Sequence, residues 1–237
     1  MIRDLSSTNS ELVELARTNK YWLEFKSPRD ERVLDTMLKV DRKDFLPSFV
    51  KFMAYYDSPL PISRKYRATC SMPSLVAAMA DLLELKEGQN VLELGTGCGY
   101  SAAITAHLIG NSGKLTTLEI IPELAEFGQK NLEAHFNSSC DNGRVKVVNK
   151  NGSLGYPENA PYDRIYLTAS LNYKYRKKYS VKIIENLLEQ VADEGILLFP
   201  EESKYSLFLL RKLGKKIQTK RFKGVSFIPF ILDEGRD

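Results

Sequence analysis

The stretch that most constrains this fold is residues 91–100, VLELGTGCGY, where a short apolar run meets three closely spaced glycines. The apolar run, residues 91–94, is typical of a buried parallel strand, although Glu93 interrupts it. Glycine permits positive φ values and lets a ligand approach the backbone without meeting a Cβ atom. An Ala-rich helical pattern begins at Tyr100 and ends at Gly110. The stretch therefore predicts a strand, a glycine turn and a helix N-terminus that together form a cradle for a nucleotide-sized ligand.

The order of the glycines separates two classes of nucleotide-binding fold. G-x-G-x-G is not the dinucleotide fingerprint G-x-G-x-x-G, because position 100 is Tyr and the third glycine comes one residue early. An acidic residue that leads into G-x-G-x-G resembles the pattern of S-adenosylmethionine (SAM) methyltransferases. The resemblance implies that SAM is the cofactor. The contacts it implies are Glu93, Gly95, Thr96, Gly97, Gly99 and Tyr100.

A second acidic residue supports the binding of a ribose. Residues 114–121, KLTTLEII, form a second strand candidate with Glu119 near its C-terminal end. Glu119 follows Gly99 by about 20 residues, the offset at which a carboxylate reaches ribose hydroxyls in a βαβ nucleotide fold. We therefore expect Glu119 and its neighbour Ile120 to contact the cofactor. The alternative is a glycine-rich turn that binds nothing, with Glu119 at a solvated strand end.

The composition describes an ordinary globular chain. With 237 residues, of which 43% are hydrophobic and 27% charged, the chain has room for one large domain. No apolar run approaches the ~18 residues needed to cross a bilayer, and the polar, acidic first 16 residues do not resemble a signal peptide. We expect a monomer that does not bind membranes.

Cysteine and histidine are sparse. The three cysteines, Cys70, Cys98 and Cys140, form no C-x-x-C pair, which favours reduced thiols in a cytoplasmic protein. With only His107 and His135 as histidines, no metal site is predicted.

Basic residues are concentrated near the C-terminus. Residues 203–232 contain no Asp or Glu. The basic residues there are Lys204, Arg211, Lys212, Lys215, Lys216, Lys220, Arg221 and Lys223. A basic surface can bind nucleic acid or attract an acidic substrate, and it can equally be the solvated face of a sheet.

Helix and strand patterns alternate along the chain. Helix candidates are residues 8–18, 31–40 (with Val33, Met37 and Leu38 on one side), 71–85, 100–110, 122–136 and 181–192 (with Val181, Ile184, Leu188 and Val191 on one stripe). Strand candidates are residues 91–94, 114–121, 145–150, 162–170, 195–200, 205–213 and 225–230. The proline-rich residues 57–62 suit only an extended edge or a loop. The last two strands are expected to form an antiparallel pair, because no helix-length segment separates them.

This alternation predicts an α/β fold, a doubly wound Rossmann-like sheet with an N-terminal helical cap and a C-terminal antiparallel strand pair. We expect one domain over residues 1–237, with residues 1–88 as the cap and substrate-side segment and 89–237 as the core. Ligands of such sheets bind beyond the carboxyl ends of the strands, where Asn151 and Thr168 are expected beside the glycine turn and Glu119.

Over residues 31–230 the sequence resembles the protein-L-isoaspartate O-methyltransferase family. The blocks that carry the resemblance are MLKVDRKDFLP, AYYDSPLPI, ATCSMPSLVAAM, VLELGTGCGYSAAITA, LEIIPELAE, NGSLGYPENAPYDRIYLTAS, LLEQVADEGILLFP and VSFIPF. The family implies transfer of the SAM methyl group to the free α-carboxylate of an isoaspartyl residue. The ester then closes to a succinimide, which hydrolyses partly to normal aspartate. Because this carboxylate is ionised at pH 7, the reaction depends on positioning more than on a strong base.

The resemblance implies that residues 68–73, ATCSMP, hold the methyl acceptor. The Ser71 hydroxyl would contact the substrate carboxylate, and Thr69 would order the same loop. A different function is also open to Ser71, because serine is a favoured N-cap and a helix is expected to start near Pro73. Both functions are compatible, since a helix N-terminus also favours a carboxylate.

The same block departs from the family pattern. Arg67 stands where the family usually has Gln, Cys70 replaces an aliphatic residue, and Ser74 falls where His is frequent. Cys70 is expected to be a small, half-buried hydrophobic residue. These departures motivate a rival hypothesis, in which the same fold methylates another carboxylate, such as an aspartate of a modified peptide.

Two further segments depart from the family. An Asp-Gly pair that contacts adenine is replaced by Asn151-Gly152, whose amide oxygen can still accept a hydrogen bond, or which forms an ordinary turn. Residues 172–182 replace a short link and carry Lys174, Arg176, Lys177, Lys178 and Lys182 among tyrosines. Basic and aromatic residues in alternation can bind single-stranded nucleic acid, form a rim for acidic peptides, or form a solvated loop. We expect the rim.

A nucleic-acid methyltransferase is the remaining rival. Enzymes that methylate nucleic-acid bases usually carry an N-P-P-Y-type motif after the fourth strand. Residues 167–170, LTAS, occupy that place and argue against this function. Isoaspartyl proteins or peptides are therefore the expected partners, and nucleic acid is not.

Overall fold

The computed structural model describes residues 6–18, 30–136 and 143–231, with backbone alone for residues 173–176. The helices are α1 (Asn9–Thr18), α2 (Glu31–Lys39), α3 (Pro73–Leu82), α4 (Tyr100–Leu108), α5 (Pro122–Phe136) and α6 (Tyr173–Gln190). The strands are β1 (Leu60–Ser63), β2 (Ala68–Cys70), β3 (Asn90–Leu94), β4 (Lys114–Glu119), β5 (Val145–Asn149), β6 (Tyr162–Leu167), β7 (Val191–Glu201), β8 (Ser206–Leu213) and β9 (Lys216–Lys223). Short 3-10 helices are η1 (Arg42–Phe45), η2 (Ser48–Met53), η3 (Gly152–Leu154), η4 (Pro157–Asn159) and η5 (Glu202–Lys204).

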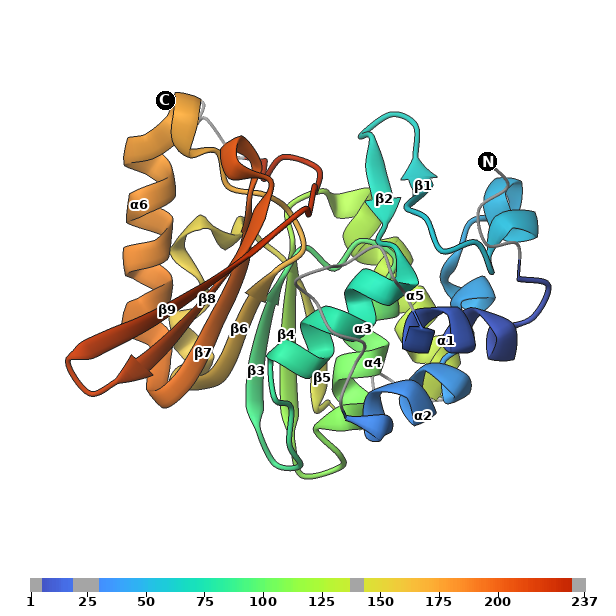
Figure 1. Cartoon of the computed structure of the whole chain (residues 1–237), viewed down its shortest axis with the longest axis horizontal. Coiled ribbons are helices and arrows are strands. Elements are labelled where there is room, and N and C mark those ends of the chain that lie inside the picture. The colour runs from blue at the N-terminus through green and yellow to red at the C-terminus, as the bar shows by residue number, and fades with distance from the viewer. Residues whose placement is uncertain (1–5, 19–29, 137–142, 232–237) are drawn as a thin grey trace.

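The large sheet has the strand order β5-β4-β3-β6-β7-β8-β9. Strands β3 to β7 run parallel, and β8 and β9 are antiparallel to their neighbours. Helix α6 covers one face of this sheet, and α3, α4 and α5 lie on the other (Figure 1). The predicted doubly wound α/β sheet is confirmed. Its order reverses between β3 and β6, which places a crevice at their carboxyl ends.

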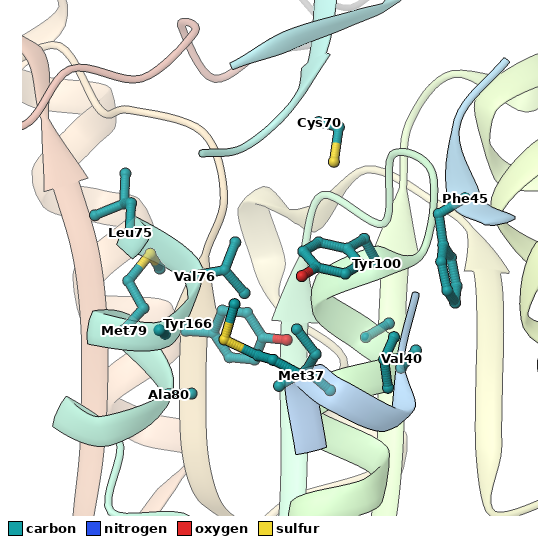
Figure 2. Close-up of a cluster of buried hydrophobic side chains, with 14 of the residues drawn as sticks. Met37, Val40, Phe45, Cys70, Leu75, Val76, Met79, Ala80, Tyr100 and Tyr166 are labelled. Atoms are coloured by element: carbon teal, nitrogen blue, oxygen red, sulfur yellow. The ribbon is translucent and has the colours of Figure 1, made fainter. Parts of the chain in front are cut away.

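The core divides into two clusters, one on each face of the sheet. Val91 of β3 packs with the helices of the N-terminal half, whereas Leu92 and Leu94 pack with α6 and its neighbours. Burial on both faces explains why β3 reads as an almost continuous apolar run. In the first cluster, Met37 and Met79 gather around the ring of Tyr166 (Figure 2).

The N-terminal segment forms helices that pack on this first cluster, as predicted. In α1, the Glu11 backbone N–H donates to Thr8 Oγ1 at 3.2 Å, so Thr8 caps the start of this helix. The predicted apolar side of α2 is partly wrong. Val33 and Met37 are buried, but Leu38 is 48% exposed and Leu34 is buried instead. The buried stripe of α2 follows the i, i+1, i+4 spacing of Val33, Leu34 and Met37, and Leu38 lies outside it.

The last predicted strand is wrong. The strand that pairs with β8 is Lys216–Lys223, not residues 225–230. Nearly every residue of β9 is exposed, because it is the edge strand, so it shows no apolar alternation in the sequence. Residues 225–230 instead run past the ends of the parallel strands, where the Ser170 N–H donates to the Ile228 carbonyl at 2.8 Å.

Helix α6 is longer at its start and shorter at its end than predicted. Its backbone is helical from Tyr173, so residues 173–182 form the first half of the helix and not a loop. Val191, predicted on the helix stripe, begins β7. The most buried positions of α6 are Ser180, Ile183 and Leu187. The Lys- and Arg-rich start of the helix hid its period in the sequence.

Candidate active site

A cavity lies at the carboxyl ends of β3, β4 and β6, below the separate two-stranded hairpin formed by β1 and β2. It contains about 890 Å³ of space, part of which is open to solvent. The predicted site residues on its wall are Thr69, Ser71, Gly95, Thr96, Gly97, Tyr100, Glu119, Ile120, Gly152 and Thr168. The cavity therefore joins the expected acceptor loop to the expected cofactor turn.

The glycine turn has the backbone conformation that its sequence predicts. Gly95 and Gly97 have φ values of 105° and 54°, which side chains rarely adopt. A Cβ atom on Gly95 would lie 2.1 Å from the Thr168 hydroxyl oxygen, and one on Gly97 would lie 3.3 Å from Ile62. Thr168 donates to the Gly95 carbonyl oxygen at 2.7 Å. The backbone of the turn at Gly95 thus packs directly against the side chain of Thr168, which follows β6. This contact leaves no room for a Cβ atom at Gly95.

Glu119 links this turn to the end of β4. Its carboxylate accepts from the Gly97 N–H at 3.0 Å and from the Ile121 N–H at 3.1 Å. The side chain is largely buried, and burial raises the pKa of its carboxyl group. An ionised carboxylate offers about four acceptor positions, so two backbone donors leave capacity for further hydroxyl groups. Glu119 lines the cavity, and its remaining acceptors suit the two hydroxyls of a ribose.

Glu93 lies beneath the turn and does not line the cavity. It is fully buried, and its carboxylate accepts from the Thr117 hydroxyl at 2.5 Å and from the Tyr166 hydroxyl at 2.8 Å. Burial raises its pKa to about 7. Thr117 also bonds Thr96 at 2.7 Å. The Glu93 carboxyl group therefore joins the ends of β3, β4 and β6 beneath the turn. It can affect a bound cofactor only through the position of the turn.

Gly99 and Asn151 also lie off the cavity wall. Gly99 faces α5, where a Cβ atom would lie 3.1 Å from the Gly128 carbonyl oxygen. The Asn151 side-chain oxygen accepts from the Ser153 N–H at 2.8 Å and so caps η3. Gly152 does line the cavity. A contact between Asn151 and adenine stays a prediction.

The acceptor loop ends β2 and leads into α3. Ser71 and Thr69 both line the cavity. The N-cap of α3 is Met72, and the Asp57 carboxylate, not Ser71, accepts from the Ser74 N–H at 2.9 Å. The predicted capping function of Ser71 is therefore wrong. Within the described part of the chain, the Ser71 hydroxyl has no hydrogen-bond partner, so it is available to a ligand.

Arg42 holds the same loop from behind, and sequence reasoning missed it. Its guanidinium is fully buried, and its two terminal nitrogens donate only to backbone carbonyl oxygens. These oxygens belong to Ala54, Tyr56, Ser58, Cys70 and Ser71, at distances of 2.8–3.3 Å. Arg42 Nε has no partner among the described residues. The only signal in the sequence is that this arginine stands in a block that resembles the family.

Gly128 of α5 is a second residue that sequence reasoning missed. A Cβ atom there would lie 2.7 Å from Thr96 Cγ2 and 2.9 Å from the Gly97 carbonyl oxygen. Only glycine therefore lets α5 approach the cofactor turn this closely. A lone glycine inside a helical pattern was the available signal.

The residues present fit a nucleotide-type cofactor. Because the turn residues are glycines, no Cβ atom stands between their backbone and the cavity. The Glu119 carboxylate has acceptor positions left beyond its two backbone donors. The Tyr100 hydroxyl also indicates that the cavity binds a polar ligand. Tyr100 lines the cavity, and its buried hydroxyl has no hydrogen-bond partner among the described residues. Burial raises the pKa of Tyr100, so it is a neutral donor.

The described residues contain no group of three or more His, Cys, Asp or Glu side chains that could hold a metal ion. None of the helices described is both long and apolar enough to cross a membrane.

Comparisons with known proteins agree with this geometry. The family described as protein-L-isoaspartate(D-aspartate) O-methyltransferase (PCMT) matches residues 8–235. A protein-L-isoaspartate O-methyltransferase of Methanococcoides burtonii is 41% identical over 204 residues, which cover 85% of this chain and 93% of that protein. One from Methanopyrus kandleri is 40% identical over 210 residues, covering 87% of this chain and 86% of that protein. A solved PCMT structure from Plasmodium falciparum, in complex with S-adenosyl-L-homocysteine, has a TM-score of 0.76 at 23% identity and covers 95% of this chain and 99% of its own.

Proposed function

The chain belongs to the protein-L-isoaspartate(D-aspartate) O-methyltransferase family, and we propose that Ser71 and Thr69 hold the methyl acceptor while the glycine turn and Glu119 hold the donor. The enzyme transfers the methyl group of SAM to the free carboxylate of L-isoaspartyl residues, a step in protein repair. The observation that carries the residue assignment is that the acceptor loop and the cofactor turn line one cavity.

The donor side is built from the cofactor turn. Gly97 and Glu119 would hold the ribose, and Ile120, Gly152 and Thr168 would line the adenosine site. When bound, SAM supplies a methyl group on a positively charged sulfur. The backbone of the turn is already fixed by the Glu119 and Thr168 hydrogen bonds, so little ordering remains for the cofactor to induce.

The acceptor side needs donors that hold a carboxylate without neutralising it. An isoaspartyl carboxylate is ionised at pH 7 and is itself the nucleophile. The Ser71 hydroxyl is a neutral donor, so it can orient this carboxylate and leave its charge intact. The buried cation Arg42 beside the loop donates to carbonyl oxygens and so fixes the loop without pairing with the nucleophile. Orientation of carboxylate and methyl group can supply much of the barrier reduction.

Transfer of labelled methyl groups from SAM to matched peptides tests the function. One peptide carries isoaspartate and its twin carries aspartate at the same position. We expect methylation of the isoaspartyl peptide and base release of the label as methanol. Equal labelling of both peptides, or labelling of neither, would contradict the isoaspartyl assignment.

The rival acceptor rests on the residues that depart from the family pattern next to the acceptor loop. Arg67 has a positive φ of 51° and is exposed on the turn that leads into the acceptor loop. Together with Cys70 and Ser74, it marks the block that departs from the family pattern. Methylation of a normal aspartate in a constrained peptide, without isoaspartyl activity, would identify this rival.

Two of the eight basic C-terminal residues have partners within the fold and so are not free to form a nucleic-acid surface. Arg211 pairs with Glu84 at 2.5 Å, and Lys212 donates to the Val191 carbonyl oxygen at 2.7 Å. Both therefore stabilise the fold. A monomeric state, a cytoplasmic location and the division at residue 88 stay predictions.

A further inference from the structure

Two exposed aromatic side chains lie beside the β1–β2 hairpin, which borders the active-site cavity. Phe49 and Phe52 of η2 are 45% and 79% exposed, whereas Val50 between them is buried in the core. Because Val50 anchors η2, both rings are held at the surface by a packed helix. An aromatic ring removes about 150–250 Å² from water when it is buried, so two exposed rings favour contact with another molecule. Phe49 and Phe52 together form the aromatic surface.

Arg64 connects the aromatic surface to the cavity. Its guanidinium carbon lies 5.4 Å from the centroid of the Phe49 ring, which is a cation–π contact. Arg64 lies in the turn of the β1–β2 hairpin, which projects beyond the large sheet (Figure 1). Ile62 and Tyr66, two residues before and two residues after Arg64, both line the cavity. Helix η2 also packs against β1. The aromatic surface and the cavity therefore share this hairpin as their common border.

Positive charge lies next to the aromatic surface. Lys51 stands between the two phenylalanines in the sequence of η2, and Arg64 and Arg67 are exposed in the hairpin turn. None of these three cations forms an ion pair within the part of the chain that the structure describes. Lys65, the remaining cation of the turn, is paired with Glu123 of α5 at 3.0 Å. A ligand on the aromatic surface therefore meets positive charge that favours acidic side chains.

We propose that the aromatic surface holds a flanking segment of the polypeptide whose isoaspartyl residue lies in the cavity. The proposal rests on the proposed function, because it gives the same substrate a second contact. An extended chain advances about 3.3 Å per residue, and the four residues of β1 span about 13 Å. A chain that leaves the cavity along the hairpin therefore reaches the rings within about four to six residues. Such a path suits an unfolded segment, which offers apolar side chains to the rings and acidic side chains to the cations.

Three isoaspartyl peptides test this contact with the full chain. They differ only about five residues from the isoaspartate, where they carry Trp-Glu, Trp-Lys or Ser-Glu. Each is made with these two residues on the N-terminal side and on the C-terminal side. The test variant combines Phe49→Ser with Phe52→Ser. The matched control combines Leu213→Ser with Ile217→Ser, an exposed apolar pair beside the β8–β9 turn. Methyl transfer gives KM and kcat, and fluorescence anisotropy follows the binding of labelled Trp-Glu peptides in which aspartate replaces isoaspartate.

In the wild type we expect Trp-Glu, on one side of the isoaspartate, to lower KM at least about fivefold below that of Ser-Glu, with kcat unchanged and Trp-Lys in between. The phenylalanine variant should lose this difference, and the control pair should keep it.

Equal KM values for the three peptides in the wild type, or a difference that the phenylalanine variant keeps, would overturn the proposal. Sedimentation that shows a dimer for the wild type and a monomer for the phenylalanine variant would also overturn it, because the aromatic surface would then join two copies of the chain. If no isoaspartyl peptide is methylated, the proposed function fails alone, since anisotropy still reports whether the wild type binds the Trp-Glu peptide and the phenylalanine variant does not.

Discussion

The guanidinium of Arg42 donates to the carbonyl oxygen of Ser71 at 2.9 Å, from a position 29 residues earlier in the chain. The same nitrogen reaches Ser58 at 2.8 Å, so one side chain joins the loop before β1 to the acceptor loop after β2. The hydroxyl of Ser71 is thereby presented to the cavity by a backbone that is fixed from behind. Arg42 thus fixes the loop that we propose for the methyl acceptor, and it donates there only to backbone carbonyl oxygens.

Replacement of Arg42 should therefore lower the stability of the fold, since its guanidinium contacts only backbone atoms and not the substrate. Arg42→Met removes hydrogen bonds to five buried or part-buried carbonyl oxygens, of which those of Tyr56 and Ser71 keep a second donor. Each group left unsatisfied costs about 1–3 kcal/mol. Relaxation of the loops recovers part of this, so we expect a loss of at least about 3 kcal/mol in urea denaturation. The exposed Arg17→Met is the control and should change stability little. An unchanged denaturation midpoint for Arg42→Met would refute this role.

Ser71→Ala tests the acceptor assignment. It removes one neutral donor to an anionic nucleophile, and we expect a loss of about 1.5–3 kcal/mol in kcat/KM, roughly tenfold to a hundredfold. SAM affinity and melting temperature should stay unchanged, because Met72 is the N-cap of α3 and Asp57 supplies the capping oxygen. Asp57→Ala is the matched control and should lower stability by about 1 kcal/mol. If Ser71→Ala retained the full kcat/KM of the wild type, Ser71 would not be the residue that holds the acceptor carboxylate.

The cap of α3 shows where a local rule failed. Serine two residues before Pro73 satisfies the usual N-cap pattern, yet the capping oxygen comes from Asp57, 17 residues from the Ser74 N–H that it accepts. Arg42 is a similar case, since its partners lie 12 to 29 residues away and are all backbone atoms. No side-chain pattern in the sequence marks such contacts.

The parts that could be predicted are those that depend on neighbours in the chain. The glycine turn follows from the strand that precedes it and the helix that follows it, and Glu119 from a fixed offset within a βαβ unit. The edge strand β9 was missed, because strand prediction depends on a buried face and β9 has almost none. Glu93 was predicted to contact the cofactor, but it does not line the cavity, and its hydrogen-bond partners on β4 and β6 could be known only from the sheet order.

Two substitutions test the cofactor side. Gly97→Val should abolish SAM binding, because Gly97 has a φ of 54° and a branched Cβ would press on Ile62 and the cofactor's path. Glu119→Ala should weaken SAM binding at least about tenfold, since hydrogen bonds to a charged acceptor contribute about 1.5–3 kcal/mol. The control is Glu123→Ala. Glu123 follows Glu119 in the chain, lies in α5 and accepts hydrogen bonds from Lys65 and Tyr66. Calorimetry that gives wild-type affinity for both test variants would show that the cradle is misassigned.

The basic start of α6 is expected to act on substrates and not on nucleic acid. The five residues are Lys174, Arg176, Lys177, Lys178 and Lys182. Because this segment is helical, Gln is the suitable replacement, as it keeps helix propensity. The variant should bind SAM normally and raise KM modestly, most for acidic peptides. Replacing Lys215, Lys216, Lys220, Arg221 and Lys223, in and beside β9, by Gln removes the same number of positive charges and controls for net charge. A nanomolar, salt-dependent affinity for RNA that the α6 variant lost would overturn this prediction.

The buried carboxyl group of Glu93 should make stability depend on pH. Burial raises its pKa from an ordinary value of 4.5 to about 7, so the folded state holds a proton that the unfolded state releases. The native state then binds more protons between these values, and its contribution to stability is lost as pH rises from about 4.5 to about 7. Glu119 acts in the same direction and His135 in the opposite one, so only a comparison with a variant isolates Glu93.

Glu93→Gln provides that comparison, because it keeps the shape of the side chain and cannot ionise. Its free energy of unfolding, measured by urea denaturation at intervals from pH 4.5 to pH 8, should decline less with pH than that of the wild type. The two curves should diverge most near pH 7, where the wild type has lost this contribution. The exposed Glu189→Gln should follow the wild type throughout. Parallel curves for Glu93→Gln and wild type would mean that the carboxyl group is already ionised at low pH, and that the hydroxyls of Thr117 and Tyr166 outweigh its burial.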